Sequence, residues 1–226
     1  WYYNEYESSV RRAYTESYLL SFEQLDAVLD RTGACWQALH TPYTPAVNTV
    51  AGFRDVKTSH WAAEYIQTVA DRSLMHGANG LFRPDDAITT EVCATVARSR
   101  KLSIPETLMP GLDHTQWYAG EVSAVYAAGL LEGLTENFRP DAVMTRADAM
   151  QLFANLLTAQ GAVLPDTAAA EPLLAPFSDA GQIPGPRRAA AALCIQKGLI
   201  SGLSDSTLQP QGSFTRAAFA KLLTMI

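Results

Sequence analysis

Two arginines stand where an acidic ligand could be bound. Arg146 and Arg216 directly follow Thr145 and Thr215 in the similar phrases "MTRAD" and "FTRAA". A threonine that precedes an apolar periodic stretch is a typical helix N-cap, so each arginine should occupy the first helical position. A cation there opposes the helix macrodipole at a cost of about 0.3–1 kcal/mol, so a compensating negative charge is expected.

That negative charge has two possible sources. A carboxylate ligand would meet the guanidinium fork and also the free N–H groups of the first helical turn. Alternatively, an aspartate of the chain itself, such as Asp113 or Asp179, forms a salt bridge with the arginine. We favour a ligand for at least one of the two arginines, and the salt bridge stays open as the alternative.

Five further residues are candidates for the same ligand site. Trp61 and Trp117 could stack on sugar rings, although a tryptophan on an amphipathic helix is more often part of the core. Gly77 and Gly133 serve first as backbone devices, and their lack of a side chain also lets a ligand approach the main chain. Asp113 is a candidate contact too, although an N-cap or turn role is the more common one for such an aspartate.

The candidate residues belong to a repeat. The phrase "LFRPDDAIT" at 81–89 returns as "NFRPDAVMT" at 137–145 and as "TLQPQGSFT" at 207–215. Each copy has an apolar residue two places before a proline and a threonine five places after it. Upstream of each copy come an aspartate, a helix-length stretch and a Leu-x-x-Gly phrase, so the whole unit recurs three times.

Each unit is predicted to form two helices joined by an ordered loop, and the threonine should cap the second helix. Gly129 and Gly198 suit the left-handed position that ends the first helix, and Ser73 replaces them in the first unit. The second helices should share inward positions, at Cys93 and Val96, Ala149 and Leu152, and Phe219 and Leu222.

The expected fold class is all-α. A two-helix unit of about 50 residues cannot bury both faces alone, so the three should pack together, as a pseudo-threefold bundle or a short solenoid. No stretch alternates with the period of two that indicates strands. We expect an aromatic helical segment and linker over 1–51 and repeats over 52–106, 107–172 and 173–226, with a loop insertion at 161–176.

Composition excludes several function classes. The 226-residue chain has a net charge of −6 and no Lys/Arg cluster, which argues against nucleic acid as a partner. Its longest apolar run, 189–195, is far shorter than the roughly 20 residues of a membrane span. Cys35, Cys93 and Cys194 lack metal-ligand spacing and are expected to be free thiols. We therefore expect no metal and no cofactor, and no catalytic constellation is recognisable.

The motifs of the three units together resemble those of S-layer homology (SLH) domains. The first unit has "FRDV", "HWAAEYI", "LMHG" and "LFRP"; the second has "WYAGEV", "LLEG", "NFRP" and "MTRAD"; the third has "FSDA", "LISG", "LQP" and "FTRAA". The resemblance covers about residues 52–226. It implies a three-pronged spindle at the bacterial cell surface, without catalysis. The resemblance also implies that grooves between the repeats bind an acidic, often pyruvylated, secondary cell-wall polysaccharide or a modified peptidoglycan.

Departures from the family pattern make the three grooves unequal. Thr90 stands where the family has an arginine, and no tryptophan lies near Asp179 in the third unit. The copy at 81–89 therefore has the weakest claim to bind a ligand. These departures also leave an alternative function open, a structural or protein-interaction module of the cell surface that has lost glycan binding.

Overall fold

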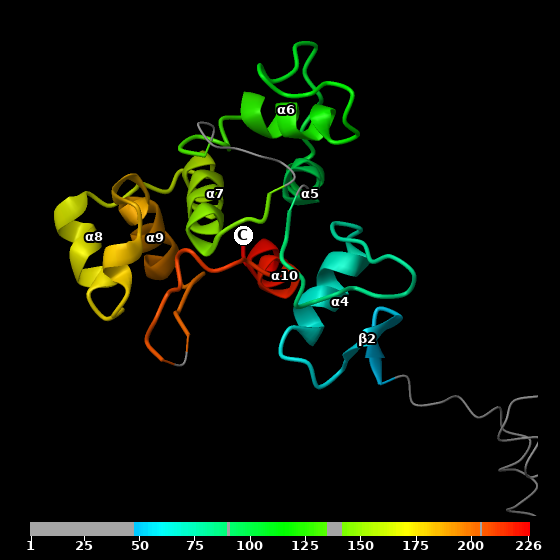
Figure 1. The fold of residues 1–226 in the computed structure, drawn as a ribbon, viewed down its shortest axis with the longest axis horizontal. Helices are drawn as coiled ribbons and strands as arrows, with labels where there is room; N and C mark the ends of the chain where they lie inside the picture. The colour runs from blue at the N-terminus through cyan, green and yellow to red at the C-terminus, as the bar shows by residue number, and fades with distance from the viewer. Residues whose placement is uncertain (1–47, 90, 135–141, 204) are drawn as a thin grey trace, which may run out of the picture. The chain divides into compact units, whose positions relative to one another are not determined.

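The computed structural model describes residues 48–89, 91–134, 142–203 and 205–226. The expected helical segment before residue 48 and Cys35 lie outside this part of the chain. The described chain is mostly helical, which confirms the all-α prediction (Figure 1). Each repeat contributes two helices: α4 (Ala63–Asp71) and α5 (Glu91–Arg100), α6 (Ala119–Ala127) and α7 (Arg146–Ala159), and α9 (Arg188–Gln196) and α10 (Arg216–Thr224).

The helices pair between repeats. The second helix of each repeat packs on the first helix of the next, so that α5 contacts α6 and α7 contacts α9. The last helix, α10, returns to pack on the first, α4, and the two lie side by side in red and cyan in Figure 1. The packing order is therefore cyclic, because a solenoid would leave its two end repeats apart. A threefold symmetry of the repeats stays a prediction.

A ring of three backbone hydrogen bonds closes this cycle. The N–H of Ile88 donates to the carbonyl of Phe214 (2.8 Å), that of Phe214 to Met144 (2.8 Å), and that of Met144 to Ile88 (3.0 Å). All three side chains are buried, and each residue directly precedes the threonine of its repeat. The constant spacing between proline and threonine thus delivers three chain segments to one junction.

Aromatic side chains fill the core beside this ring. Phe219 of α10 is fully buried, with its ring centroid 5.6 Å from that of Phe153 in α7 and 6.5 Å from that of Phe214. Both pairs are edge-on, an arrangement that aromatic rings favour. The predicted inward positions of the three second helices are confirmed as buried: Cys93, Val96, Ala149, Leu152, Phe219 and Leu222.

The predicted helix boundaries are also confirmed where they can be followed. The Thr145 hydroxyl accepts from the N–H of Asp148 (3.1 Å), and the Asp148 carboxylate in turn accepts from the Thr145 N–H, which completes a capping box. Thr215 accepts from the N–H of Ala218 (3.2 Å). A residue in the left-handed conformation follows the first helix of the first two repeats, with φ +53° at Ser73 and +73° at Gly129. Ser73 therefore takes the position that a glycine has in the second repeat, as predicted.

Two segments differ from their prediction. Strand β1 (Thr49–Val50) pairs antiparallel with β2 (Phe53–Lys57), whereas the sequence pattern predicts no strand. The connector 161–176 contains α8 (Thr167–Leu174), which packs on α9, rather than a loop alone. Asp166 caps α8 by accepting from the N–H of Ala169 (2.8 Å), and the internal Pro172 conceals the helix in the sequence. Two short 3-10 helices, η2 (Ala180–Gln182) and η3 (Gly185–Arg187), lead into α9.

Two of the three cysteines can be placed. Cys93 and Cys194 are buried free thiols, and burial raises the pKa of each to about 12. Both therefore act as small apolar core residues rather than as reactive thiols.

Candidate functional site

An aspartate clamps the proline loop of the first and third repeats. The Asp55 carboxylate accepts the N–H groups of Phe82 (2.9 Å) and Arg83 (2.6 Å). Asp179 holds Leu208 (2.8 Å) and Gln209 (2.7 Å) in the same way. The second residue of each pair has positive φ, +57° at Arg83 and +48° at Gln209, a conformation that non-glycine residues rarely adopt. Each clamp therefore supports a strained turn in the proline loop, a partner segment that the sequence did not reveal.

Replacing Asp55 by asparagine should lower the free energy of unfolding by about 1–2 kcal/mol, because the amide has one acceptor oxygen in place of the two that accept the N–H groups. This value is at the low end for a charged acceptor because the carboxylate is exposed. Burial alone would raise the pKa of Asp55, but the N–H groups of Phe82 and Arg83 hold it below its usual value of 3.8. The stabilisation is therefore present above that value and is lost as the pH falls through the lower pKa of the folded state. Urea unfolding at pH 6 and pH 3 should show the difference between wild type and variant shrink at the lower pH. Asp85→Asn, at an exposed position, is the matched control, and an equal difference at both pH values would contradict the clamp.

The glycine of the Leu-x-x-Gly phrase accommodates a neighbouring aromatic ring. A Cβ on Gly77 would collide with the Leu81 carbonyl and with the ring of Phe53, and one on Gly202 would collide with the ring of Phe177. Gly133 has φ +75° and lies against the side chain of Gln151. The backbone role expected for these glycines is therefore the main one.

Gly77→Ala should lower the free energy of unfolding by about 1–3 kcal/mol, because the added methyl group has no space between the Leu81 carbonyl and Phe53. Thermal unfolding measures the change. Gly181→Ala is the control, since a Cβ there meets nothing within 4 Å and its φ is not in the left-handed region. Equal melting temperatures for the two variants would contradict the packing described here.

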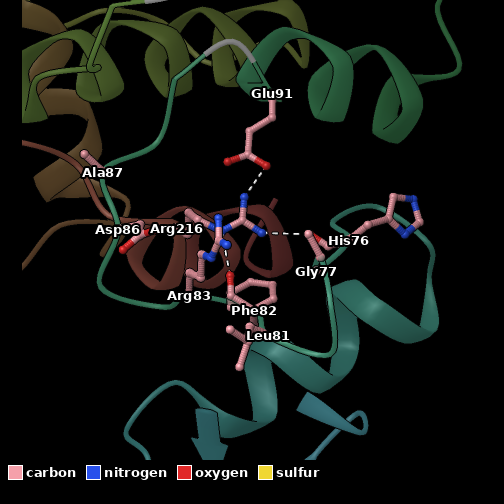
Figure 2. A pocket seen from close by; sticks show the side chains of 10 residues that line it. His76, Gly77, Leu81, Phe82, Arg83, Asp86, Ala87, Glu91 and Arg216 are labelled. Carbon is pink, nitrogen blue, oxygen red and sulfur yellow. Dashed lines mark hydrogen bonds and ion pairs between the residues drawn. The ribbon is translucent and has the colours of Figure 1, made fainter. Parts of the chain in front are cut away.

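The first proline loop lines a cavity of about 240 Å³ together with an arginine from another repeat (Figure 2). The Arg216 side chain, on α10, enters this cavity beside Gly77 and the 81–83 segment. Its Nε donates to the carbonyl of Phe82 (2.8 Å), one Nη donates to that of His76 (2.8 Å), and the other Nη forms an ion pair with Glu91. Arg216 is 8% exposed, and its guanidinium lies over the Phe82 ring, 4.8 Å from the centroid. Two of the predicted site residues, Arg216 and Gly77, are thus brought together.

Arg146 occupies the corresponding position one repeat earlier. Its Nε donates to the carbonyl of Leu208 (2.6 Å), the equivalent of Phe82 in the third repeat. Its side chain is partly buried, and it forms no ion pair among the residues that the structure describes. Burial lowers the pKa of the Arg146 guanidinium, and the nearby Asp179 carboxylate partly offsets this effect. Asp179 is therefore an electrostatic neighbour of Arg146 but not a salt-bridge partner.

The N–H groups at these helix starts are already bonded to a loop of another repeat. The N–H groups of Arg216 and Ala217 donate to the carbonyls of Asp86 (3.0 Å) and Pro84 (2.9 Å). Those of Arg146 and Ala147 donate in the same manner to Gly212 (2.8 Å) and Pro210 (2.9 Å). The predicted contact between a ligand carboxylate and free N–H groups is therefore wrong at these four positions. The guanidinium of each arginine is the group that could still meet a ligand carboxylate.

The pairing of loop and arginine shows which arginine belongs to the copy at 81–89. The sequence predicts this copy to be the weakest binder because Thr90 follows its threonine, and that ranking stays a prediction. The structure places Arg216 of the third repeat against this loop, so the arginine of a groove comes from the preceding repeat in the cycle. Thr90 and residues 135–141 lie outside the described part of the chain.

The other predicted site residues lie apart from the arginine cavity. Trp61 and Trp117 are 58% and 66% exposed, so the expectation that they belong to the core is wrong. Trp61 lies 5.7 Å from the ring of His60, and Trp117 lies 5.5 Å from that of Tyr118. Asp113 is exposed and accepts from Thr115 and Gln116, hydrogen bonds that lower its pKa to about 2. It is a turn former, while the tryptophans remain free to contact a ligand outside the cavity.

Neither a metal centre nor a membrane span was found in the described chain. No three His, Cys, Asp or Glu side chains gather there in a way that could hold a metal ion. Within the same residues, no helix is both long and apolar enough to cross a bilayer.

Comparison with known proteins identifies the repeats. The model of the S-layer homology domain matches residues 52–89, 113–150 and 176–220, which together make up more than half of the chain. The chain belongs to the S-layer homology domain family. The family match coincides with the three structural repeats, and it confirms the resemblance seen in the sequence motifs.

Similar proteins share this SLH region. A cellulosome-anchoring protein of Acetivibrio thermocellus is 32% identical over 114 residues, 46% of this chain and 26% of that protein. The S-layer protein sap of Bacillus anthracis is 28% identical over 104 residues, 44% of this chain and 13% of that protein. An amylopullulanase of Thermoanaerobacterium thermosulfurigenes is 26% identical over 179 residues, 76% of this chain.

The chain spans only 9% of the length of that amylopullulanase. The likeness is therefore one between SLH regions and carries no catalytic activity to this chain. Family membership and the surface-layer relatives place the chain at the bacterial cell surface and support a cell-wall anchoring module.

Proposed function

We propose that this SLH chain anchors a surface protein to the bacterial cell wall by binding an acidic secondary cell-wall polysaccharide, pyruvylated on its sugars, without catalysis. We place the anchoring site at Arg146 of the second repeat, whose side chain is hydrogen-bonded to the proline loop of the third repeat. Trp61 and Trp117 offer exposed indole faces for further sugar contacts.

The state of the Arg146 side chain carries this proposal. The guanidinium is partly buried, has one neutral carbonyl as a hydrogen-bond partner, and forms no ion pair in the described chain. Partial removal of a cation from water is unfavourable, and the nearby Asp179 offsets this cost only in part because its carboxylate forms no ion pair with Arg146. A ligand carboxylate bound directly to the guanidinium would provide the remaining compensation. A guanidinium fork binds such a carboxylate in bidentate geometry.

Sedimentation with purified sacculi tests the function. The protein should sediment with intact sacculi and remain in the supernatant once the secondary polysaccharide has been stripped chemically. Equal sedimentation with stripped sacculi would contradict a polysaccharide ligand. A folded protein that ignores both preparations would favour the alternative of a module that has lost glycan binding.

A further inference from the structure

One carboxylate distinguishes the two arginine grooves. The hydrogen-bonded ring of Ile88, Met144 and Phe214 aligns the three repeats residue by residue. Three residues beyond this ring, the first repeat has Glu91, whereas the second and third have Ala147 and Ala217. An acidic side chain therefore enters one groove at a position that is apolar in the other two repeats.

Glu91 completes the coordination of Arg216. The three nitrogens of the Arg216 guanidinium are all engaged, by two main-chain carbonyls and by the Glu91 carboxylate, as Figure 2 shows. Only 10% of the Arg216 side chain is exposed. The Glu91 side chain is 30% exposed and lines the cavity from the side of α5.

Arg146 has no such carboxylate partner among the residues that the structure describes. Its Nε has the equivalent carbonyl, that of Leu208, but its two Nη atoms have no hydrogen-bond partner in the described chain. The position that corresponds to Glu91 in this groove belongs to the buried methyl group of Ala217. The nearby Asp179 carboxylate is bonded to the N–H groups of Leu208 and Gln209.

We infer that the Glu91 carboxylate occupies the place that the carboxylate of an acidic ligand would take at Arg216. Acidic ligands should therefore bind at Arg146 in preference to Arg216. Glu91 is then a specificity-determining residue, because an incoming carboxylate at Arg216 would have to displace it and leave it unpaired against like charge. This inference rests on the proposed function, in that it assumes that the arginine grooves take a carboxylate ligand.

The inference can be tested on the whole chain with sodium pyruvate as the probe. The ¹⁵N–¹H signals of the two arginine Nε groups, assigned with R146K and R216K, report each groove separately. In the wild type, pyruvate should shift the Arg146 signal, and binding at Arg216 should be weaker by about tenfold or more. In E91Q, the Arg216 signal should respond at pyruvate concentrations close to those that shift Arg146.

The outcomes separate this inference from the proposed function. Equal responses of both arginines in the wild type, or a silent Arg216 in a folded E91Q, would overturn the role of Glu91 and leave the proposed function in place. No response of either arginine in any variant would overturn both. The wild-type comparison decides the question alone if E91Q does not fold, which its amide spectrum would reveal.

Discussion

Phe219→Ala is expected to lower the free energy of unfolding by about 3–5 kcal/mol and the melting temperature by roughly 10 °C. Phe219 is fully buried and packs edge-on against Phe153 and Phe214. Phe153 lies in the second repeat and Phe214 in the backbone ring, so the cavity would open where repeats meet. Both neighbouring rings are themselves fully buried, so they have little room to move into the cavity, and most of the lost packing should remain lost.

Thermal and urea unfolding followed by circular dichroism measure this effect. Val163→Ala is the control, because Val163 is 82% exposed and its truncation should change stability by no more than about 0.5 kcal/mol. Phe153→Ala should give a loss similar to that of Phe219→Ala, and the double variant should lose less than the sum, since the two rings share one contact. A loss below about 1 kcal/mol for Phe219→Ala would contradict a common core for the repeats.

Arg146→Ala should weaken binding to intact sacculi by about 10- to 100-fold, because a charge-assisted hydrogen bond to a carboxylate contributes about 1.5–3 kcal/mol. Arg146→Lys should recover only part of the affinity, since an ammonium group cannot form the bidentate contact. Arg216→Ala should weaken binding less, because its guanidinium is already saturated.

Sedimentation isotherms compare these variants. Arg72→Ala, at the exposed end of α4, is the matched control and should bind as the wild type does. Arg146→Ala removes a hydrogen bond to Leu208 as well as a charge, so its melting temperature is measured alongside. Undiminished binding by a folded Arg146→Ala would contradict the assignment of the ligand to this groove.

Local features of the fold could be predicted from the sequence because their causes are local. Thr145 and Asp148 lie within one helical turn, so the capping box follows from the spacing alone. Ser73 was placed in a left-handed position because it aligns with Gly129. The tryptophan prediction failed for a related reason: Trp61 precedes α4, which begins at Ala63, so it is not on the buried face of that helix.

The composition of the grooves could not be predicted, because it depends on how the chain closes. Arg216 meets Phe82 and Glu91 only because α10 packs against α4, and no spacing within a repeat indicates this pairing. The role of Asp55 was hidden in the same way, since its partners lie at the far end of the repeat. Repeat motifs specify each unit, while the contacts between units create the candidate site.

A crystal structure of the chain with a fragment of its released cell-wall polysaccharide would test the central claim most directly. We predict a ligand carboxylate bound to the Nη atoms of Arg146, which have no partner among the described residues, while Arg216 keeps its ion pair with Glu91. A ligand bound only away from Arg146, or one that meets neither arginine, would contradict the account.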